Sequence, residues 1–437
     1  MLRVTIGSVS VPPAVSRRVL LAAAVATGGA LLTGCGAPRA TTHNGRIPFT
    51  PGRVLRPGVS GYGEGLHETV SRYLLPTPDH PKHPSYAGAV VLAGVDGLIG
   101  AHHAVGDALR YEAGPRELPP AGRVRMRPDA VFDLASLTKV FTSVVALQLI
   151  ERGRFDLDDH VADHLPDFVA GPRGAAKAGV TVRMLLSHTS GLPSVINLAA
   201  ASSVAARRAA VLATPLVLGV QPGTRYRYSD LNMMTLGLLV ERVARMSLPD
   251  LVRDGVTGPL GLADTGYRPA DRMSRDELAA RMVATEAKKL RGLIRGHVHD
   301  ENAMALGGVA GHAGLFGTAR DLAVFCQMLI NGGEYGGRRV LTEDTVRTLF
   351  ANTNADLPRR AAHGLGVDLD QPWYMGRLAS PSTCGHTGFT GTSIVVDPRR
   401  RAFVVLLTNR VHPDRNFGGV NPTRAAVADA VALSIGV

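Results

Sequence analysis

Two pairs of short apolar runs lie at opposite ends of the 437-residue chain, and they constrain its fold more than any other feature. Residues 86–94 and 98–101 form the first pair, joined by Asp96-Gly97, a dipeptide that favours a tight β-hairpin turn. Residues 392–398 and 402–409 form the second pair. Apolar helices are expected between the two hairpins. The sequence therefore predicts an α+β fold, with one antiparallel sheet built from both chain ends, flanking helices and an inserted, mostly helical domain.

The first 34 residues resemble a bacterial export signal. Arg17 and Arg18 precede an apolar run that ends at Leu32, and this run is too short to span a bilayer stably. Leu32-Thr33-Gly34-Cys35 closes the run and resembles a lipobox, in which the cysteine is lipidated and becomes the new N-terminus. The Ser16-Arg17-Arg18 start also resembles a twin-arginine signal. We expect a lipoprotein anchored through Cys35 to the outer face of the cell membrane; an uncleaved signal anchor and cleavage elsewhere are the alternatives.

The rest of the chain divides into a linker and one large domain. Residues 35–63 are rich in Pro, Gly, Thr and Arg and have little apolar periodicity, which favours a flexible tether. Residues 64–437 are enough for a substantial core. We expect an α/β part at about 64–130 and 335–437, and a helical part at about 131–334.

The formal net charge of +12 permits an anionic partner. No basic run with interleaved aromatic residues stands out, so we predict no nucleic-acid partner. Anionic head groups or wall polymers fit the charge equally well. An arginine-rich composition without a specific partner is the simplest explanation.

Ser136 and Lys139 lie at the start of an apolar helix that is expected to reach Ile150 and to stop at Gly153. Residues three apart share one face of a helix, so the two side chains can meet. A serine hydroxyl is a poor nucleophile until a base takes its proton, and a lysine can be that base if desolvation lowers its pKa. Ser-x-x-Lys occurs by chance in many chains, so this motif alone is weak.

Three motifs together resemble those of the penicillin-recognising serine hydrolases. The branch is that of class C β-lactamases, D-alanyl-D-alanine carboxypeptidases, D-aminopeptidases and related esterases. The motifs are Ser136-Leu137-Thr138-Lys139, Tyr228-Ser229-Asp230 and His386-Thr387-Gly388, in an order and rough spacing that fit. Residues 185–193 and 308–316 are also similar to accessory stretches of this family, and the resemblance covers about residues 65–435. It implies a β-lactamase/transpeptidase-like fold.

The resemblance also implies a role for each residue. Ser136 would attack a carbonyl and form an acyl-enzyme. Lys139 and Tyr228 would share the proton transfer, with the lysine charge lowering the pKa of the tyrosine, and either could be the general base. The backbone N–H groups of Ser136 and Phe389 would form the oxyanion hole.

Two residues depart from the usual motifs on the substrate-binding side, which would comprise Asp230, His386, Thr387, Gly388 and Phe389. His386 stands where lysine is usual, and Asp230 where asparagine is usual. A mostly neutral imidazole and an acceptor-only carboxylate would attract a substrate carboxylate and its amide less well. We therefore expect an ester, an amide or an unusual D-peptide rather than efficient β-lactam hydrolysis. Because the ordinary pKa of histidine is near 6.5, a substrate carboxylate beside His386 should bind better as the pH falls.

Competing chemistries have weaker support in the sequence. His297, His299 and His312 could bind a metal, but no H-E-x-x-H helix accompanies them, so we predict no metal and no cofactor. No G-x-S-x-G elbow is present, which disfavours an α/β-hydrolase.

His188, Cys326 and Cys384 are expected to have structural rather than catalytic roles. His188 is expected to be a hydrogen-bonded structural residue. Cys326 and Cys384 could pair outside the cytoplasm, although a buried thiol is favoured for Cys326.

The sequence as a whole predicts an envelope-facing serine hydrolase. It would act by acyl-enzyme formation on an ester, an amide, a β-lactam or a D-amino-acid peptide. Its partners would be a small or peptidoglycan-like substrate and the membrane that holds the lipid anchor. The alternative is a catalytically silent, wall-binding lipoprotein of the same fold. The oligomeric state is not predicted.

Overall fold

A computed structural model describes residues 47–437 apart from 59–64, 79 and 172. The chain divides into two compact units, residues 1–46 and 47–437, and only the second is described. The predicted signal peptide and Cys35 lie outside the described residues. No helix among the described residues is long and apolar enough to cross a membrane.

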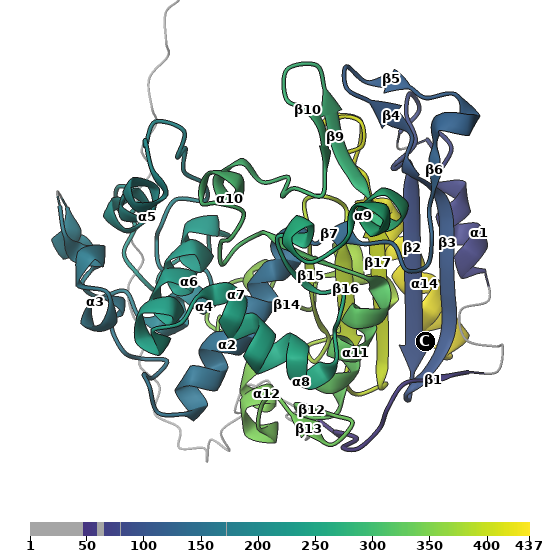
Figure 1. The fold of residues 1–437 in the computed structure, drawn as a ribbon. Helices are drawn as coiled ribbons and strands as arrows, with labels where there is room; N and C mark the ends of the chain where they lie inside the picture. The colour runs from purple at the N-terminus through teal and green to yellow at the C-terminus, as the bar shows by residue number, and fades with distance from the viewer. Residues whose placement is uncertain (1–46, 59–64, 79, 172) are drawn as a thin grey trace, which may run out of the picture. The chain divides into compact units, whose positions relative to one another are not determined.

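A mixed sheet built from both ends of the unit forms its centre (Figure 1). Eight of the described strands belong to it, in the order β1-β3-β2-β17-β16-β15-β14, with β6 beside β3. The strands are β1 (Arg56–Pro57), β2 (Gly88–Val95), β3 (Leu98–Leu109), β4 (Tyr111–Glu112), β5 (Arg116–Glu117), β6 (Val124–Arg125), β7 (Phe132–Asp133), β8 (Gly266–Tyr267), β9 (Ala284–Lys288), β10 (Gly292–Arg295), β11 (Leu315–Gly317), β12 (Glu334–Tyr335), β13 (Arg338–Arg339), β14 (Asp368–Leu369), β15 (Cys384–Thr387), β16 (Ser393–Asp397) and β17 (Ala402–Thr408).

The two predicted hairpins are confirmed, and the chain ends meet where β17 pairs antiparallel with β2. The register runs from Ala402 opposite Val95 to Thr408 opposite Ala89. Only β1 runs parallel to its neighbour, β3, among the pairs of this sheet. The predicted α+β fold, with a sheet built from both chain ends, is therefore confirmed.

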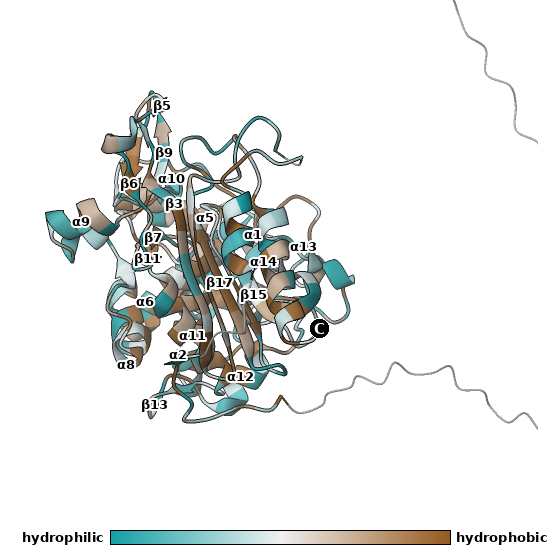
Figure 2. Ribbon diagram, turned by 90° about the vertical axis from the view of Figure 1, so that its right-hand side faces the viewer, coloured by the Kyte–Doolittle hydropathy of each residue, from teal (hydrophilic) through white to brown (hydrophobic). Residues whose placement is uncertain are grey.

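Helices cover both faces of the sheet, as Figure 2 shows from the side. The described helices are α1 (Leu66–Arg72), α2 (Thr138–Glu151), α3 (Val161–His164), α4 (Val182–Leu186), α5 (Val204–Ala213), α6 (Asp230–Ala244), α7 (Leu248–Val252), α8 (Gly258–Leu260), α9 (Arg275–Arg281), α10 (Glu301–Ala305), α11 (Ala319–Ile330), α12 (Glu343–Leu349), α13 (Pro372–Met375) and α14 (Asn421–Ser434).

Alternate residues of the central strands enter different cores. Val90 and Leu92 of β2 pack in the larger core, which also contains α2 and α11, whereas Val91 and Ala93 pack in the smaller core with α1, α13 and α14. Side chains alternate across a strand, so a strand covered on both faces is apolar throughout. Every residue of β2 is accordingly buried.

Part of the predicted tether packs on the main unit instead. Residues 47–58 belong to the second compact unit, where β1 pairs with Leu98 and Ile99 of β3. The Thr50 hydroxyl also donates to Asn331 Oδ1 at 3.2 Å. Backbone pairing of this kind needs no apolar periodicity, which is why composition did not reveal it. The remainder of the predicted tether, 35–46 and 59–63, lies outside the described residues.

The predicted helical part, about 131–334, holds short strands as well as helices. Five described strands, β7 to β11, fall within it, and they are only two to five residues long. Runs this short show no readable period. Its last helix, α11, packs on β2, β16 and β17 of the central sheet.

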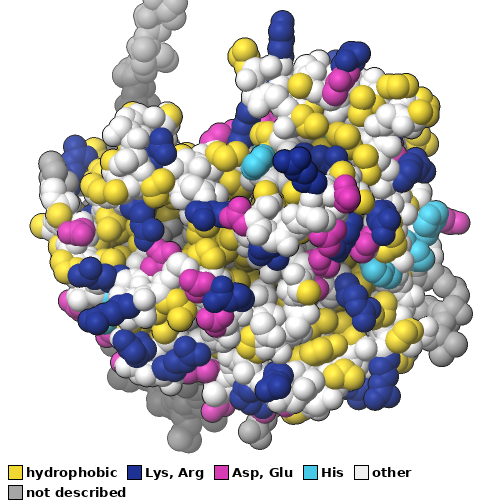
Figure 3. All heavy atoms as spheres, in the orientation of Figure 1, with side chains coloured by type: hydrophobic (Ala, Val, Ile, Leu, Met, Phe, Trp, Pro, Cys, Tyr) yellow, Lys and Arg dark blue, Asp and Glu magenta, His cyan; other side chains and the backbone are white. Residues whose placement is uncertain are grey.

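The basic residues do not gather into one patch on the face drawn in Figure 3. Lys and Arg side chains are spread over it, and many lie beside Asp or Glu.

Candidate active site

Ser136 lies in a tight turn between β7 and α2. Ala135, just before it, has a φ of 48°, a left-handed conformation that costs a residue with a Cβ about 1–2 kcal/mol. The buried Asp133 carboxylate stabilises the turn, because it accepts hydrogen bonds from the Ala135 N–H at 2.9 Å and the His299 N–H at 2.6 Å. A 3₁₀ turn over Ala135–Leu137 then leads into α2. This geometry presents the Ser136 side chain at the start of the helix.

Lys139 is buried next to Ser136 and is held by several polar groups, Tyr228 among them. Its Nζ donates to Ser136 Oγ at 2.8 Å and to the His312 carbonyl at 3.2 Å, and lies 2.8 Å from Asp230 Oδ1. Burial alone would lower the pKa of Lys139, but the Asp230 carboxylate and Tyr228 oppose burial, and the pKa ends above its ordinary value. The condition under which Lys139 could be the base, a pKa lowered by desolvation, is therefore not met in the resting site, where Lys139 is a cation.

Tyr228 is buried in the loop before α6, and Lys139 Nζ lies 4.9 Å from the centre of its ring. The hydroxyl interacts with Lys139 and Ser136. Burial raises the pKa of Tyr228, the Lys139 charge lowers it and Asp230 raises it again, so the net shift is upward. The predicted lowering by Lys139 is present but is outweighed. Both candidate bases are therefore protonated at neutral pH.

Two residues beside Tyr228 explain how its loop is held. Ser229 caps α6, and its side chain accepts from the Asn232 N–H. His188, with a φ of 58°, packs 4.7 Å from the Tyr228 ring and accepts at Nδ1 from the Asn232 amide at 3.0 Å. The predicted structural role of His188 fits these contacts.

The third motif begins on β15 and ends at Gly388, in the turn before β16, and this turn is hydrogen-bonded to the segment that precedes Ser136. The Thr390 hydroxyl donates to the Asp133 carbonyl at 2.8 Å, and the Thr392 hydroxyl donates to the Leu134 carbonyl at 3.0 Å. A Cβ at Gly388 would lie 2.0 Å from Thr392 Oγ1 and 2.7 Å from the Leu134 oxygen. Only glycine therefore fits between the two segments.

The backbone N–H groups of Ser136 and Phe389 belong to the two segments that this junction joins. Neither has a hydrogen-bond acceptor among the described residues. Arg424 of α14 braces the Phe389 side, since its Nη2 donates to the carbonyls of Gly388 at 2.7 Å and Thr392 at 2.8 Å. Two unpaired N–H groups on a braced backbone are what an oxyanion hole requires.

His386, on β15, is buried and uncharged at neutral pH. Its Nδ1 donates to the Thr387 carbonyl at 2.8 Å, so Nε2 is the unprotonated nitrogen, and Nε2 has no partner among the described residues. Burial lowers the pKa of His386 to about 4, with Asp368 opposing the shift. The expectation that it would titrate near 6.5 is wrong, because burial removes the water that would stabilise the imidazolium.

One pocket of about 660 Å³ brings the predicted residues together. Seven of them line it, while Lys139 lies buried behind Ser136; the seven are Ser136, Tyr228, Asp230, His386, Thr387, Gly388 and Phe389. Three apolar side chains at the pocket are exposed, Val195 by 68%, Phe389 by 50% and Trp373 by 46%. No sequence motif indicated that Val195 and Trp373 would line the pocket. Nor did any motif indicate other lining residues, which are Tyr226, Asp300, Glu301, Asp368, Arg410, Arg415 and Arg424.

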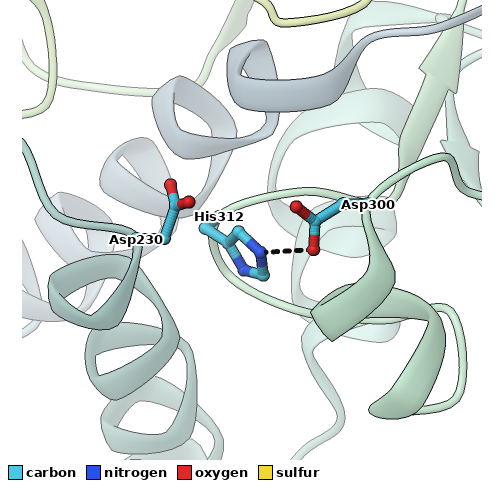
Figure 4. A group of neighbouring side chains, drawn as sticks. All are labelled: Asp230, Asp300 and His312. Atoms are coloured by element: carbon cyan, nitrogen blue, oxygen red, sulfur yellow. Dashed lines mark hydrogen bonds and ion pairs between the residues drawn. The ribbon is translucent and has the colours of Figure 1, made fainter. Parts of the chain in front are cut away.

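Figure 4 shows the one cluster among the described residues whose ligand atoms are close enough for a metal, Asp230, Asp300 and His312. The three histidines considered from sequence do not assemble: His297 is exposed, and His299 Nε2 lies 3.2 Å from Glu286. In the cluster, His312 Nε2 bonds Asp300 at 2.9 Å, and Asp230 is already paired with Lys139. A metal ion would have to compete with the lysine charge.

Cys326 and Cys384 are both free and buried. Burial raises the pKa of each thiol.

Known proteins resemble the chain over the region that carries this site. A family model described as Beta-lactamase matches residues 86–429. A protein of Escherichia coli K12 described as "Putative D-alanyl-D-alanine carboxypeptidase" is 34% identical over 317 residues, which cover 66% of this chain and 71% of that protein. A relative from Escherichia coli O157:H7 with the same description is 33% identical over 355 residues, 75% of this chain and 79% of its own.

Solved structures share the fold. A penicillin-binding protein homologue from Caulobacter crescentus has a TM-score of 0.63 at 22% identity, covering 86% of this chain and 99% of that one. EstCE1, a hydrolase with promiscuous acyltransferase activity, has a TM-score of 0.63 at 23% identity, covering 84% and 99%. Together with the family match across most of its length, these findings show that the chain belongs to the Beta-lactamase family.

Proposed function

We propose that this protein is an envelope serine hydrolase that forms an acyl-enzyme on Ser136. The observation that carries the proposal is the 2.8 Å hydrogen bond from Lys139 Nζ to Ser136 Oγ at the edge of a pocket with two unpaired backbone N–H groups. Acyl transfer needs a nucleophile, a pair of residues that transfers protons, and a site that stabilises the negatively charged carbonyl oxygen.

The proposed reaction begins with attack of Ser136 Oγ on a substrate carbonyl. The new Oγ–C bond places negative charge on the carbonyl oxygen, which the N–H groups of Ser136 and Phe389 stabilise by about 3–4 kcal/mol per donor. The bond to the leaving group then breaks, and the leaving group takes a proton from the Lys139–Tyr228 pair. Water attacks the acyl-enzyme in the second half-reaction and releases the acid and free Ser136.

Ser136 can lose its own proton only after Lys139 or Tyr228 has lost one, because both are protonated in the resting site. The Asp230 carboxylate, whose Oδ1 lies 2.8 Å from Lys139 Nζ, stabilises the charged lysine and opposes that loss. The reaction should therefore speed up with rising pH.

We propose esters, amides and D-amino-acid peptides as substrates. The description of the two Escherichia coli relatives, which names a D-alanyl-D-alanine carboxypeptidase, supports a peptide ending in D-alanine as a substrate. Phe389, Trp373 and Val195 offer apolar contact to a side chain or an acyl group. A β-lactam carboxylate would meet an uncharged His386 where lysine is usual, so we expect slow β-lactam hydrolysis.

Hydrolysis of a small panel tests the proposal. The panel is nitrocefin, p-nitrophenyl butyrate and an acetylated peptide ending in D-Ala-D-Ala. We expect turnover of the ester and the peptide and little of nitrocefin. No turnover of any of the three, on folded protein, would contradict the proposal and favour the silent wall-binding lipoprotein.

A further inference from the structure

A second cavity is lined by α6, the helix that begins at Asp230 of the catalytic pocket. It has a volume of about 340 Å³ and is bounded by α5, α6, α7 and residues 306–311, elements that lie together at the left of Figure 1. Its walls are mostly aliphatic, with Met234 and Leu238 of α6, Leu248 of α7 and Val309 among them. Pockets for small ligands begin near this volume, at about 300 Å³.

The charges at the cavity leave one cation without an acidic partner. Arg208 is paired with Glu241, whose other oxygen accepts from the Leu248 N–H at 2.9 Å. Arg268 also lines the cavity and donates from Nε to the Gly307 carbonyl at 2.8 Å. It makes no ion pair with any described carboxylate. An aliphatic cavity with one uncompensated guanidinium is complementary to an aliphatic chain that ends in a carboxylate.

The floor of the cavity is the backbone that holds Lys139 on its other side. Ala310 and Gly311 line the cavity, and the next residue, His312, supplies the carbonyl that accepts from Lys139 Nζ. The Gly311 carbonyl accepts from the Thr142 hydroxyl at 2.8 Å. A Cβ at Gly311 would lie 2.1 Å from the Met233 carbonyl, so this backbone packs directly on α6.

The helix that forms one wall carries another partner of Lys139. α6 starts at Asp230, the residue paired with Lys139, and continues through Met234 and Leu238 to Glu241 at the cavity. Two polar partners of Lys139, Asp230 and the His312 carbonyl, therefore belong to segments that continue into the lining of the cavity. Because Gly311 packs so closely on α6, a displacement of either segment is transmitted to the other rather than absorbed.

We propose that this cavity binds a medium-chain aliphatic carboxylate, and that its occupation slows the reaction at Ser136 by displacing the His312 carbonyl. The proposal that the cavity binds this ligand depends only on the cavity, whereas the proposed effect on the reaction rests on the proposed function. A natural ligand of this chemistry would be a free fatty acid or the acyl product of a lipase-type reaction.

Calorimetry with sodium octanoate on the whole protein tests the site. Binding should weaken about 15-fold for hexanoate, which has two methylenes fewer, because each buried methylene contributes about fourfold to affinity. Octanol, which lacks the charge, should bind more weakly than octanoate. If hexanoate binds as tightly as octanoate, the aliphatic pocket is contradicted. If octanol binds as tightly as octanoate, the cationic end is contradicted.

Two cavity variants and a matched control locate the binding. Arg268→Gln should weaken octanoate about fivefold and leave octanol unchanged, and Leu238→Phe should weaken both by filling the cavity. Arg242→Gln, on the same helix but outside the cavity, should change neither. Octanoate affinity that is unchanged in both cavity variants would overturn the site, and would assign the binding to the catalytic pocket.

Saturating octanoate should lower kcat for p-nitrophenyl butyrate several-fold in the wild type and in Arg242→Gln. Leu238→Phe should be insensitive at the same concentration. An unchanged kcat at saturation would overturn the coupling. If the protein hydrolyses nothing while octanoate still binds as described, the proposed function and the coupling fail, but the binding site does not.

Discussion

Asp230 Oδ1 lies 2.8 Å from Lys139 Nζ, and this ion pair sets the resting charge of the active site. The lysine side chain is 1% exposed and the aspartate 20%, so water screens the pair weakly. The family resemblance suggested that an aspartate at this position merely binds substrate less well than asparagine. In the structure it also neutralises the lysine, which changes the proton chemistry of Ser136.

Asp230→Asn should shift the rising limb of the pH profile of kcat/KM to lower pH by about 1–3 units. Asp230 raises the pKa of Lys139, and without it only Tyr228 would oppose the lowering by burial, so the neutral amine forms at lower pH. The measurement is p-nitrophenyl ester hydrolysis from pH 6 to 10. Asp158→Asn, which removes a surface carboxylate paired with Arg183, is the control. An unshifted limb would show that Lys139 does not deprotonate during turnover.

Thr392→Val should lower kcat about 10- to 100-fold with little change in KM. The variant keeps the shape of the side chain but loses the hydrogen bond to the Leu134 carbonyl that ties the Phe389 turn to the Ser136 turn. One displaced oxyanion donor costs up to about 100- to 1000-fold in kcat. The unfolding free energy should fall by about 1–3 kcal/mol, measured by denaturant titration.

Thr348→Val is the matched control, because its hydroxyl only donates to the Asp344 carbonyl within exposed α12. Its kcat should equal that of the wild type. A Thr392→Val variant with normal kcat would mean that the two turns hold their positions without this hydrogen bond, and that the tie has no catalytic role.

His386→Lys should raise activity on carboxylate-bearing substrates relative to neutral esters. In the wild type the ratio of kcat/KM for a penicillin to that for a p-nitrophenyl ester should stay flat between pH 5.5 and 8. His386 gains its proton only as the pH falls through about 4, so it is neutral throughout this window. A lysine would be charged, and an interaction of about 1 kcal/mol raises the ratio several-fold. A wild-type ratio that rises on acidification above pH 5.5 would contradict the buried, neutral imidazole.

Cys35→Ala should release the protein from the membrane fraction of the cells that make it. The lipobox-like Leu32-Thr33-Gly34-Cys35 supplies the only residue we propose for lipidation, and loss of two acyl chains removes stable anchoring. Fractionation followed by immunoblotting is the measurement, and Ser16→Ala, outside the lipobox, is the control. A variant that stays in the membrane fraction would show that residues 19–32 act as an uncleaved anchor.

Sequence patterns predicted the sheet and the main helices because those elements are continuous apolar runs. The hairpins around Asp96-Gly97 and residues 399–401 and the helix after Ser136 all appear where the apolar runs placed them. The short strand β7 has no such signal, although it positions Ser136. Its identity as a strand depends on pairing with β11, which lies more than 180 residues later in the chain.

Residues of all three motifs line one pocket in the structure, but the motifs could not predict the charge states of these residues. The pKa values of Lys139, Tyr228 and His386 follow from burial and from neighbours such as Asp230 and Asp368, which only the fold brings close. The hydrogen bonds that the Thr390 and Thr392 hydroxyls donate could not be predicted either, since nothing in the spacing of these residues indicates contact with residues near 134.

Intact-protein mass spectrometry after treatment with a fluorophosphonate tests the central claim most directly. We predict one covalent adduct per chain in the wild type, located on Ser136 by peptide mapping, and none in Ser136→Ala. Thermal unfolding should show that the variant is folded, because the substitution removes a single oxygen. An adduct that persists in Ser136→Ala, or a folded wild type that never forms one, would contradict Ser136 as the nucleophile.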